Sequence, residues 1–299
     1  MRIGLLGNAG SWYVSDLQRA GTERGHTVER LDYPTLTVSV GSERGITAEG
    51  RDLTDRQSLQ NIDLLSFDSL VIRTMPPGSL EQIVFRMDTL SRLEALGVRV
   101  LNPPRTIEHA VDKFLTTSTL AAAGLPVPET LVCESTVEAL VGLERLGGDV
   151  LVKPIFGAEG RGIVRVSDPD LGQRVFRTLE RMQSVLYLQR FIQHPGYDIR
   201  ILTLGGEVIG AIRRHANHSY KTNVACGGKA EAYDPTPEEV DLALKAASAV
   251  GVPFAGVDLL SGPDGKRYVI EVNGIPGWKG FSSATGIDVA SHVVEWLER

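Results

Sequence analysis

Hydrophobic and polar positions along the first hundred residues follow two periods. Short apolar runs predict buried strands, and apolar residues with helical spacing predict amphipathic helices between them. We expect strands at residues 3–6, 28–31, 67–73 and 98–101, helices at residues 13–24 and 81–96, and an exposed hairpin within residues 35–53. Strands that alternate with helices are typical of an open α/β sheet. The run Asn102-Pro103-Pro104 then breaks the pattern and indicates a domain boundary.

Beyond this boundary the strands and helices no longer alternate strictly, which indicates an α+β arrangement. We expect helices at residues 108–123, 137–146, 237–250 and 286–297, and strands at residues 130–133, 150–153, 163–166, 186–192, 198–204, 207–214, 256–260 and 268–273. A glycine-rich turn joins two of these strands, so the strand–loop–helix order of a P-loop is absent from the pattern. The sequence therefore predicts three units, at residues 1–102, 103–190 and 191–299.

Two predicted strands near the carboxyl end carry oxygen donors at positions where a buried strand is normally apolar. Asp258 and Glu271 lie on either side of a turn at residues 262–265, so a hairpin would place them opposite each other. Asn273 follows Glu271 on the same face, because side chains alternate with period two. Three converging oxygens favour a hard cation such as Mg²⁺. The alternatives are an acid paired with a nearby arginine and a solvated strand face.

A lysine beside the glycine-rich turn indicates that the chain binds polyphosphate. Lys153 ends a predicted buried strand, where its ammonium can neutralise phosphate oxygens. Gly157, Gly160 and Gly162 would let the backbone come close to the same phosphates. Magnesium held by the later hairpin would bridge phosphate oxygens and offset their charge during transfer. The alternative for Lys153 is a strand-end lysine that pairs with a surface acid.

Composition narrows the class of protein. The chain has 299 residues, a formal net charge of -6, and two cysteines that are far apart in the sequence. The negative charge argues against general nucleic-acid binding, and the cysteines suit a reducing compartment and exclude a sulfur-based zinc site. No run approaches the ~20 apolar residues of a membrane span, and the amino terminus lacks signal-peptide features. We therefore expect a cytoplasmic protein that binds neither nucleic acid nor membrane.

The order of these residues resembles that of the ATP-grasp ligases, and more narrowly that of the RimK-like α-L-glutamate ligases. The shared patterns are Gln-x-Phe-Ile, Asp-Ile-Arg, Ala-Gly-Val-Asp, Glu-Val-Asn-x-x-Pro-Gly and Thr-Gly-Ile-Asp, at residues 189–192, 198–200, 255–258, 271–277 and 285–288. The likeness is strong over residues 103–299. It implies an amino-terminal open α/β (pre-ATP-grasp) domain, followed by a two-subdomain α+β ATP-grasp fold that binds ATP between its subdomains.

The resemblance also implies a role for each matching residue. Asp258, Glu271 and Asn273 would hold two Mg²⁺ ions, with Glu271 bridging them and Mn²⁺ as a substitute. The implied catalytic residues are Arg214, which would steady the transferred phosphoryl group, Lys153 and Asn223. The implied nucleotide-binding residues are Lys113, Lys153, Gly157, Gly160, Gly162, Gln189, Arg190, Phe191, Ile192, Asp198, Arg200 and Lys221. Of these, residues 189–192 would meet adenine largely through the backbone, and Asp198 would meet the ribose.

These roles imply a ligase that joins a carboxylate to an amine. ATP converts the carboxylate to an acyl phosphate, the amine attacks it, and phosphate leaves as the amide forms. Segments 73–78 and 277–280 are similar to those of RimK-like proteins of tetrahydromethanopterin-dependent metabolism, which implies that L-glutamate is added to a coenzyme carboxylate. Glutamylation of the carboxyl terminus of a ribosomal protein is one alternative, and a non-catalytic ATP-binding regulatory module is another. A homo-oligomer, either dimer or tetramer, is expected.

For three further sequence features, two interpretations remain possible in each case. Arg73 ends a predicted strand, where it would either bind the acceptor or be a surface arginine. Trp278 would either stack on an acceptor ring or pack in the interior. The turn at residues 7–10 precedes a helix and resembles a phosphate-binding turn, but a simple connection from strand to helix is favoured.

Overall fold

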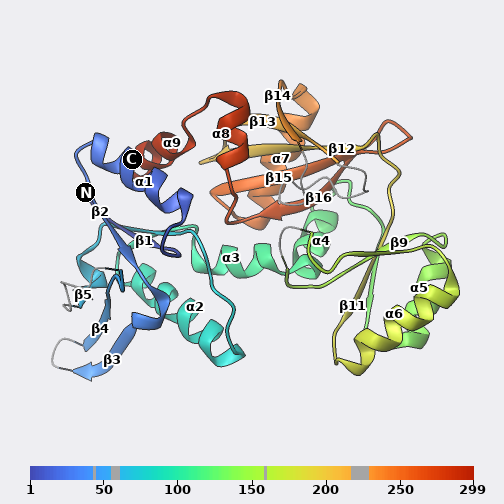
Figure 1. Ribbon diagram of the computed structural model, residues 1–299, viewed down its shortest axis with the longest axis horizontal. Helices are drawn as coiled ribbons and strands as arrows, with labels where there is room; N and C mark the ends of the chain where they lie inside the picture. Colours follow the sequence, from blue (N-terminus) through green and yellow to red (C-terminus); the bar gives the residue numbers. More distant parts are fainter. Residues whose placement is uncertain (43–44, 55–60, 158–159, 217–228) are drawn as a thin grey trace.

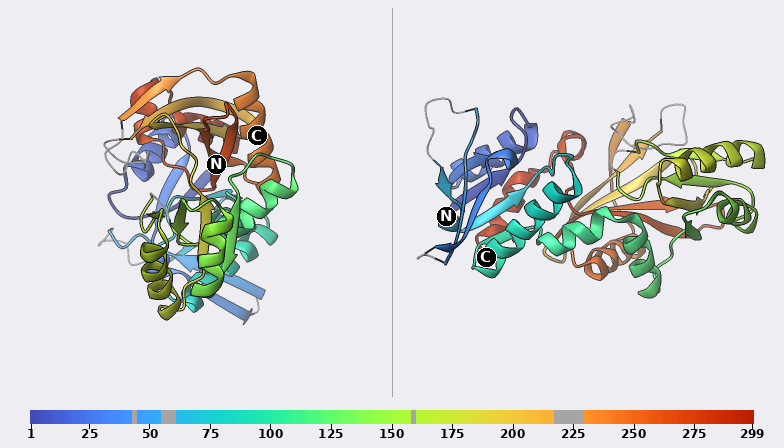
Figure 2. Two further views of the ribbon diagram at one scale, coloured as in Figure 1. Left: turned by 90° about the vertical axis from the view of Figure 1, so that its right-hand side faces the viewer. Right: turned by 90° about the horizontal axis from the view of Figure 1, so that it is seen from below.

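The computed structural model describes residues 1–42, 45–54, 61–157, 160–216 and 229–299, and in these ranges the chain forms four β-sheets with helices packed against them. The sheets follow one another along an elongated molecule, from the amino-terminal unit to the glycine-rich hairpin (Figures 1 and 2). None of the described helices combines the length and the apolar character that crossing a membrane requires.

The first unit is the open α/β sheet that the sequence predicts. Its parallel strands have the order β2-β1-β6-β7. The strands are β1 (Arg2–Leu6), β2 (Thr27–Leu31), β6 (Ser69–Ile72) and β7 (Arg99–Leu101), and the helices are α1 (Trp12–Glu23) and α2 (Leu80–Ala95). The chain leaves β1 toward one edge of the sheet and leaves β6 toward the other. The carboxyl ends of β1 and β6 therefore form the switch point of this sheet.

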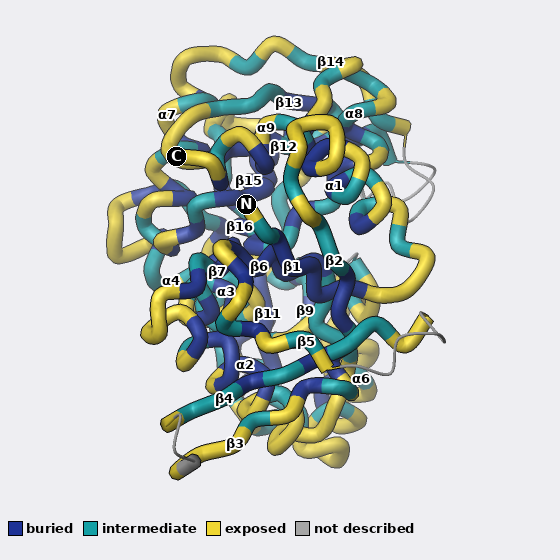
Figure 3. Tube along the Cα trace, turned by 90° about the vertical axis from the view of Figure 1, so that its left-hand side faces the viewer, coloured by how far each residue is buried: buried dark blue, intermediate teal, exposed yellow. Residues whose placement is uncertain are grey.

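The expected exposed hairpin is present as a small antiparallel sheet beside the first unit. Its strands are β3 (Thr37–Ser42), β4 (Gly45–Gly50) and β5 (Ile62–Asp63), with the 3-10 turns η1 (Tyr33–Thr35) and η2 (Leu64–Ser66) next to them. Figure 3 shows β1 and β6 buried in the centre of this end of the molecule and β3 largely exposed at its rim.

The second unit is an antiparallel sheet of order β10-β9-β11-β8. It comprises β8 (Thr130–Cys133), β9 (Val150–Lys153), β10 (Val164–Val166), β11 (Leu186–Arg190), α5 (Thr136–Arg145) and α6 (Pro169–Arg181). Strands β9 and β10 pair antiparallel, which confirms the strand–turn–strand reading of the glycine run. Helix α6 was not expected. It was missed although Asp168-Pro169 is a helix-start signal and Leu171, Val175 and Leu179 repeat with helical spacing.

The third unit is a sheet of order β14-β13-β12-β15-β16. It comprises β12 (Tyr197–Leu204), β13 (Glu207–His215), β14 (Lys229–Tyr233), β15 (Phe254–Ser261), β16 (Arg267–Asn273), α7 (Pro237–Val250), α8 (Lys279–Thr285) and α9 (Val289–Leu297). Asp258 and Glu271 are register partners in the antiparallel pair of β15 and β16, as the sequence predicts. A bulge follows Asp258.

The single helix expected at residues 108–123 is wrong, because the chain turns sharply at Asp112. Two helices occupy the segment, α3 (Pro104–Val111) and α4 (Lys113–Ala122). Asp112 has an extended backbone, and its carboxylate accepts a hydrogen bond from the Leu115 amide at 2.9 Å, which caps α4. Periodicity alone does not distinguish one helix from two that meet at a cap. The break places Lys113 at the first position of α4.

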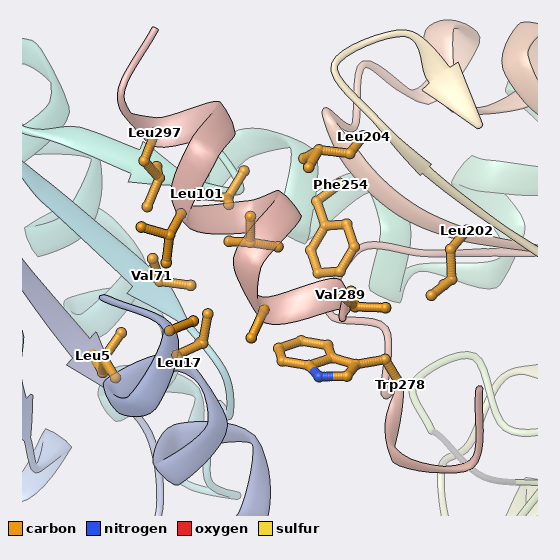
Figure 4. Close-up of a cluster of buried hydrophobic side chains, with 14 of the residues drawn as sticks. Leu5, Leu17, Val71, Leu101, Leu202, Leu204, Phe254, Trp278, Val289 and Leu297 are labelled. Atoms are coloured by element: carbon orange, nitrogen blue, oxygen red, sulfur yellow. The ribbon is translucent and has the colours of Figure 1, made fainter. Parts of the chain in front are cut away.

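A shared core joins the two ends of the chain. Helix α9 lies beside α1 (Figure 1), and Val289 and Leu297 pack with Leu5, Leu17 and Val71 of the first unit (Figure 4). The carboxyl-terminal helix therefore packs against the first sheet, although it follows the third sheet in sequence. The boundaries at residues 102 and 190 stay a prediction.

Candidate functional site

A pocket lies where the second and third sheets face each other, with the start of α4 at its side. It contains about 910 Å³ of empty space, part of which is open to solvent, and this size suits a small-molecule ligand. Its apolar lining includes Leu151, Ile163, Phe191, Ile192, Leu260 and Ile270. Its charged and amide lining residues are Lys113, Lys153, Arg161, Gln189, Arg190, Asp198, Arg214, Asp258 and Glu271. The fold thus brings together most of the residues singled out from the sequence.

Two lysines reach the pocket from different elements. The Lys113 ammonium donates to the Gly157 carbonyl at 2.6 Å, and the Lys153 ammonium donates to the Gln189 side-chain oxygen at 2.6 Å. Burial lowers the pKa of both amines, that of Lys153 to about 8, while the charge of Glu271 opposes the shift. Neither lysine forms an ion pair with an acid of the described chain. An anion that entered the pocket would therefore relieve an unfavourable charge.

The glycine-rich hairpin needs its glycines for backbone geometry. Gly160 and Gly162 have φ values of 71° and 74°, in the left-handed region that glycine adopts without strain. A Cβ atom at Gly157 would lie 3.0 Å from the Pro154 ring, so a side chain there would crowd the turn next to Lys153. Residues 158 and 159 lie outside the described ranges.

Four charged residues of the third sheet form a buried ion-pair cluster. The Arg214 guanidinium binds the Asp198 carboxylate through two hydrogen bonds of 2.7 and 2.6 Å and reaches Asp258 at 2.8 Å. Arg200 binds Asp258 through two further hydrogen bonds of 2.7 Å. Burial alone raises the pKa of Asp258, but the two guanidinium groups outweigh it and hold this pKa below its usual value. Asp258 is thus both a pocket residue and an acid paired with arginines, which was the alternative that the sequence left open.

Glu271 differs from Asp258 in having no such partner. It lines the pocket opposite Asp258, and its carboxylate makes no hydrogen bond or ion pair to any group within the described ranges. Its negative charge nevertheless acts on Lys113 and Lys153, because it opposes the lowering of their pKa values by burial. A carboxylate without a protein partner, close to two cations and a second acid, is available to a ligand.

The oxygen donors of the hairpin fit a magnesium site that the substrate completes. Where the chain is described, no group of three or more His, Cys, Asp and Glu side chains is placed to hold a metal. Mg²⁺ is usually bound by one or two carboxylates together with waters and substrate phosphates. The Glu271 carboxylate has no partner within the described ranges and is free to bind an ion. Asp258 Oδ1 accepts one hydrogen bond, which leaves a lone pair for a metal. The Asn273 oxygen accepts from the Ile275 amide at 2.9 Å, and Asn273 is not a lining residue of the pocket.

The segment expected to meet adenine lines the pocket, and its Arg190 and Phe191 amides already donate to the Glu129 and Asp149 carbonyls at 2.8 and 2.9 Å. The Arg190 side chain turns away, because it donates to the Leu146 carbonyl at 3.2 Å and pairs with Glu129 at 2.7 Å. The Phe191 ring lies under the Arg165 guanidinium at 3.7 Å. Lys221 and Asn223, the two remaining residues of the predicted site, lie outside the described residues.

Arg73 and Trp278 are both interior residues. The Arg73 guanidinium lies 4.3 Å from the Trp278 ring and 5.1 Å from the Tyr13 ring and donates to the Pro276 carbonyl at 2.8 Å. Arg73 is therefore not a surface arginine, and burial lowers its pKa to about 10. Trp278 is fully buried, and its indole N–H donates to Asp16 at 2.8 Å. The Trp278 ring packs in the interior, so stacking on an acceptor is excluded.

Replacing Trp278 by alanine is expected to lower the free energy of unfolding by about 3–5 kcal/mol, because it leaves a cavity and removes a ring that covers Arg73. Urea denaturation of the variant beside the wild-type protein measures this. Trp12→Ala is the matched control, since Trp12 is 37% exposed and its loss is expected to cost much less. Equal destabilisation by the two substitutions would contradict the interior role of Trp278.

The sequence analysis missed several residues that line the pocket. Leu151 and Leu260 are two positions away from Lys153 and Asp258, so the period of two along β9 and β15 would have identified them. His194 and Arg161 lie in irregular segments, where no period applies. Tyr187 was counted only as an apolar strand residue, although its hydroxyl bonds to a side chain of the pocket.

Comparisons with known proteins agree with this geometry. A model of the RimK-like ATP-grasp domain matches residues 110–297. A tetrahydromethanopterin:alpha-L-glutamate ligase of Methanosarcina acetivorans is 36% identical over 96% of this chain and 95% of its own length. A ribosomal protein bS6–L-glutamate ligase of Escherichia coli is 31% identical over 100% and 96%.

Solved structures support the fold. The ATP-grasp ligase PsnB, complexed with minimal precursor, Mg and ADP, has a TM-score of 0.74 and 21% identity, over 99% of this chain and 98% of its own. The RimK domain ATP-grasp protein of Sphaerobacter thermophilus has the same TM-score and identity, over 99% of both chains.

Proposed function

The chain belongs to the RimK-like ATP-grasp family, and on this premise we propose that it uses ATP and Mg²⁺ to join L-glutamate to a carboxylate of a small-molecule acceptor. The observation that carries the proposal is the convergence of two lysines, Arg214 and the Asp258–Glu271 pair in one pocket of suitable size. A non-catalytic module that had kept only the fold would be expected to have lost one of Asp258, Glu271, Asn273 and Arg214, and all four are present.

Different residues of the pocket bind different parts of ATP. Lys113, Lys153 and the glycine-rich hairpin bind the phosphates, and the backbone of residues 189–192 binds adenine. Asp198 would meet the ribose, Arg200 and Lys221 would bind the nucleotide, and Asn223 would act in catalysis. Asp258, Glu271 and Asn273 would hold magnesium, which would supply positive charge to offset that of the phosphates. Two ions at this site, and Mn²⁺ as a substitute, are part of the proposal.

The reaction needs positioning and charge stabilisation more than a protein nucleophile. An oxygen of the acceptor carboxylate takes the γ-phosphoryl group from ATP, which releases ADP. The amine of glutamate then attacks the acyl carbon, loses a proton, and expels phosphate as the amide bond forms. Arg214 and Lys153 stabilise the negative charge that moves between these groups.

The relatives support a coenzyme as the acceptor. The tetrahydromethanopterin:alpha-L-glutamate ligase of Methanosarcina acetivorans shares 36% of its residues with this chain over nearly the whole length, whereas the ribosomal protein ligase shares 31%. We therefore propose a pterin-like coenzyme that carries a free carboxylate. The carboxyl terminus of a protein such as a ribosomal protein is the second candidate, because that relative also matches the full chain. The cytoplasmic location and a dimer or tetramer are proposed on the sequence alone.

Affinity for ATP is expected to fall as the pH rises through about 8. Lys153 attracts phosphate only as an ammonium, and its pKa of about 8 means that the neutral amine predominates above this pH. The loss is up to about tenfold per pH unit, because binding must then include protonation. The charged groups that act on this amine are Glu271, Lys113 and Asp258. Titration calorimetry with a non-hydrolysable ATP analogue between pH 7 and about 9.5 measures the effect.

Lys153→Arg is the matched variant for this pH dependence, because a guanidinium keeps its charge over the whole range. Its affinity for the analogue is expected to stay nearly constant with pH. A wild-type affinity that does not change through pH 8 would show that Lys153 is not the phosphate-binding group.

The proposed function is tested by incubating the purified protein with ATP, Mg²⁺, L-glutamate and a panel of acceptors. The panel contains reduced pterin coenzymes with a terminal carboxylate and peptides with the carboxyl-terminal sequence of a ribosomal protein. Mass spectrometry is expected to show one or more added glutamyl residues on the coenzyme, with one ADP released per addition. Addition to the peptides alone would favour the second candidate. Failure of every pair to release ADP would contradict a ligase.

A further inference from the structure

A buried chain of hydrogen bonds runs from α4 to the ammonium of Lys153. Lys153 donates to the Gln189 oxygen at 2.6 Å, and the Gln189 nitrogen lies 3.2 Å from the Tyr187 hydroxyl. The Tyr187 hydroxyl lies 2.8 Å from the Thr117 hydroxyl on α4. We propose that Tyr187 and Gln189 are positioning residues that hold the Lys153 ammonium toward the phosphates. The proposal rests on the proposed function, since it assigns how one of its binding groups is oriented.

The bonds from Lys153 to the Gln189 amide have one consistent direction. An ammonium only donates, so the Gln189 oxygen must face Lys153 and its nitrogen must face the other way. That nitrogen has two hydrogens, which go to the hydroxyls of Thr130 and Tyr187, both at 3.2 Å. In the last bond, between the hydroxyls of Tyr187 and Thr117, either oxygen can be the donor. Burial raises the pKa of Tyr187, which keeps the phenol protonated.

Strand pairing explains why these residues meet. Tyr187 on β11 is the register partner of Lys153 on β9, and Gln189 follows Tyr187 on the same face. Tyr187 and Gln189 are almost completely buried, at 1% and 2% exposed. Polar side chains at such positions cost stability unless they are bonded, so a fully satisfied chain that ends on a pocket lysine indicates a purpose beyond packing.

The same chain links the two lysines of the pocket. Thr117 is four residues after Lys113 on α4, so the two side chains lie on one face of the helix. Lys113 and Lys153 therefore share one scaffold, from the start of α4 through Tyr187 and Gln189 to β9. A lysine on a flexible stem loses much conformational freedom when it binds a ligand, and holding it in place beforehand lowers that cost.

Tyr187→Phe is expected to weaken binding of a non-hydrolysable ATP analogue by about three- to tenfold, because the Tyr187 hydroxyl loses its bonds to Gln189 and Thr117 and the Gln189 amide is no longer held from α4. The KM for ATP is expected to rise by a similar factor, while the KM values for glutamate and the acceptor stay unchanged. Tyr268→Phe is the matched control, since the Tyr268 hydroxyl bonds to Asp264 in the exposed turn that follows β15. Titration calorimetry and urea denaturation of both variants measure affinity and folding.

A double-mutant cycle separates positioning from a general structural role. In a Lys153→Met background there is no ammonium to hold, so Tyr187→Phe is expected to leave analogue affinity unchanged. The same three- to tenfold loss in that background would overturn the inference, and so would an unchanged affinity of the single variant in a wild-type protein that binds the analogue. A wild-type protein that fails to bind the analogue would contradict the proposed function, and this inference with it.

Discussion

Replacing Glu271 by glutamine is expected to lower turnover on the order of a thousandfold and to leave the fold intact. A metal bound to transferring phosphate supplies several kcal/mol of charge stabilisation, and each 1.36 kcal/mol corresponds to about tenfold in rate. Glutamine keeps the size of the side chain but removes the charge that holds the ion. Stability should not fall, because the Glu271 carboxylate makes no hydrogen bond or ion pair to the described part of the protein. Steady-state ADP release and circular dichroism measure the two effects.

A second readout separates loss of the metal from other causes of inactivity. Calorimetry with a non-hydrolysable ATP analogue is expected to show that Mg²⁺ strengthens binding in the wild-type protein and has little effect in Glu271→Gln. Glu144→Gln makes the same chemical change on the exposed face of α5 and is expected to behave as the wild type. Normal turnover of Glu271→Gln would refute the assignment of this acid as a metal ligand.

Replacing Arg214 by methionine is expected to lower the free energy of unfolding by about 3–5 kcal/mol and to abolish turnover. Arg214 is buried, and its removal leaves the Asp198 carboxylate without the two hydrogen bonds of this guanidinium in a site with little water. Asp258 would keep Arg200 as its partner. Urea denaturation measures the loss. Arg105→Met is the control, because Arg105 forms an exposed ion pair with Glu108, and such pairs contribute less than about 1 kcal/mol.

Removing the negative charge of Asp198 distinguishes the role of Arg214 in folding from its role in catalysis. Asp198→Asn in the Arg214→Met background is expected to restore part of the stability, since a buried amide tolerates the loss of the two Arg214 hydrogen bonds better than a buried carboxylate does. Turnover is expected to stay lost, because the group that stabilises the transferred phosphoryl is still missing. A double variant that recovers turnover together with stability would show that Arg214 acts only through folding.

Strand positions could be predicted because local patterns determine them. Asp258 and Glu271 lie on strands of clear apolar character joined by a short turn, but the register that the turn sets would pair Asp258 with Ile270. The bulge after Asp258 shifts the register and places Glu271 opposite Asp258, which the sequence pattern does not record. The break at Asp112 could not be predicted in this way, because a capped junction between helices keeps the same apolar spacing. Helix α6 could have been predicted, because its Asp-Pro start and the spacing of Leu171, Val175 and Leu179 are local signals. The packing of α9 against α1 depends on contacts between the two ends of the chain, which no local pattern records.

The charged residues of the pocket could be predicted individually, but the ion pairs between them could not. Arg200, Arg214, Asp198 and Asp258 were identified one by one, whereas their mutual pairing depends on the register of three strands of one sheet. The same holds for Tyr187, whose hydroxyl matters only because β11 brings it beside Lys153. Arg73 and Trp278 illustrate the opposite case. Their sequence positions suggested ligand contacts, and the fold uses them to join the first unit to the segment that follows β16.

The most direct test of the account is a single-turnover assay with the purified protein, L-glutamate, Mg²⁺, a carboxylate acceptor and ATP labelled in the γ-phosphate. We expect phosphate to be released only when the acceptor and an amine are both present. With glutamate the phosphate equals the new amide in amount, and with hydroxylamine in place of glutamate it equals the hydroxamate of the acceptor that traps the acyl phosphate. ATP that stays intact with every acceptor, or phosphate released at the same rate without any acceptor, would contradict the assignment of this pocket as the active site of a glutamate ligase.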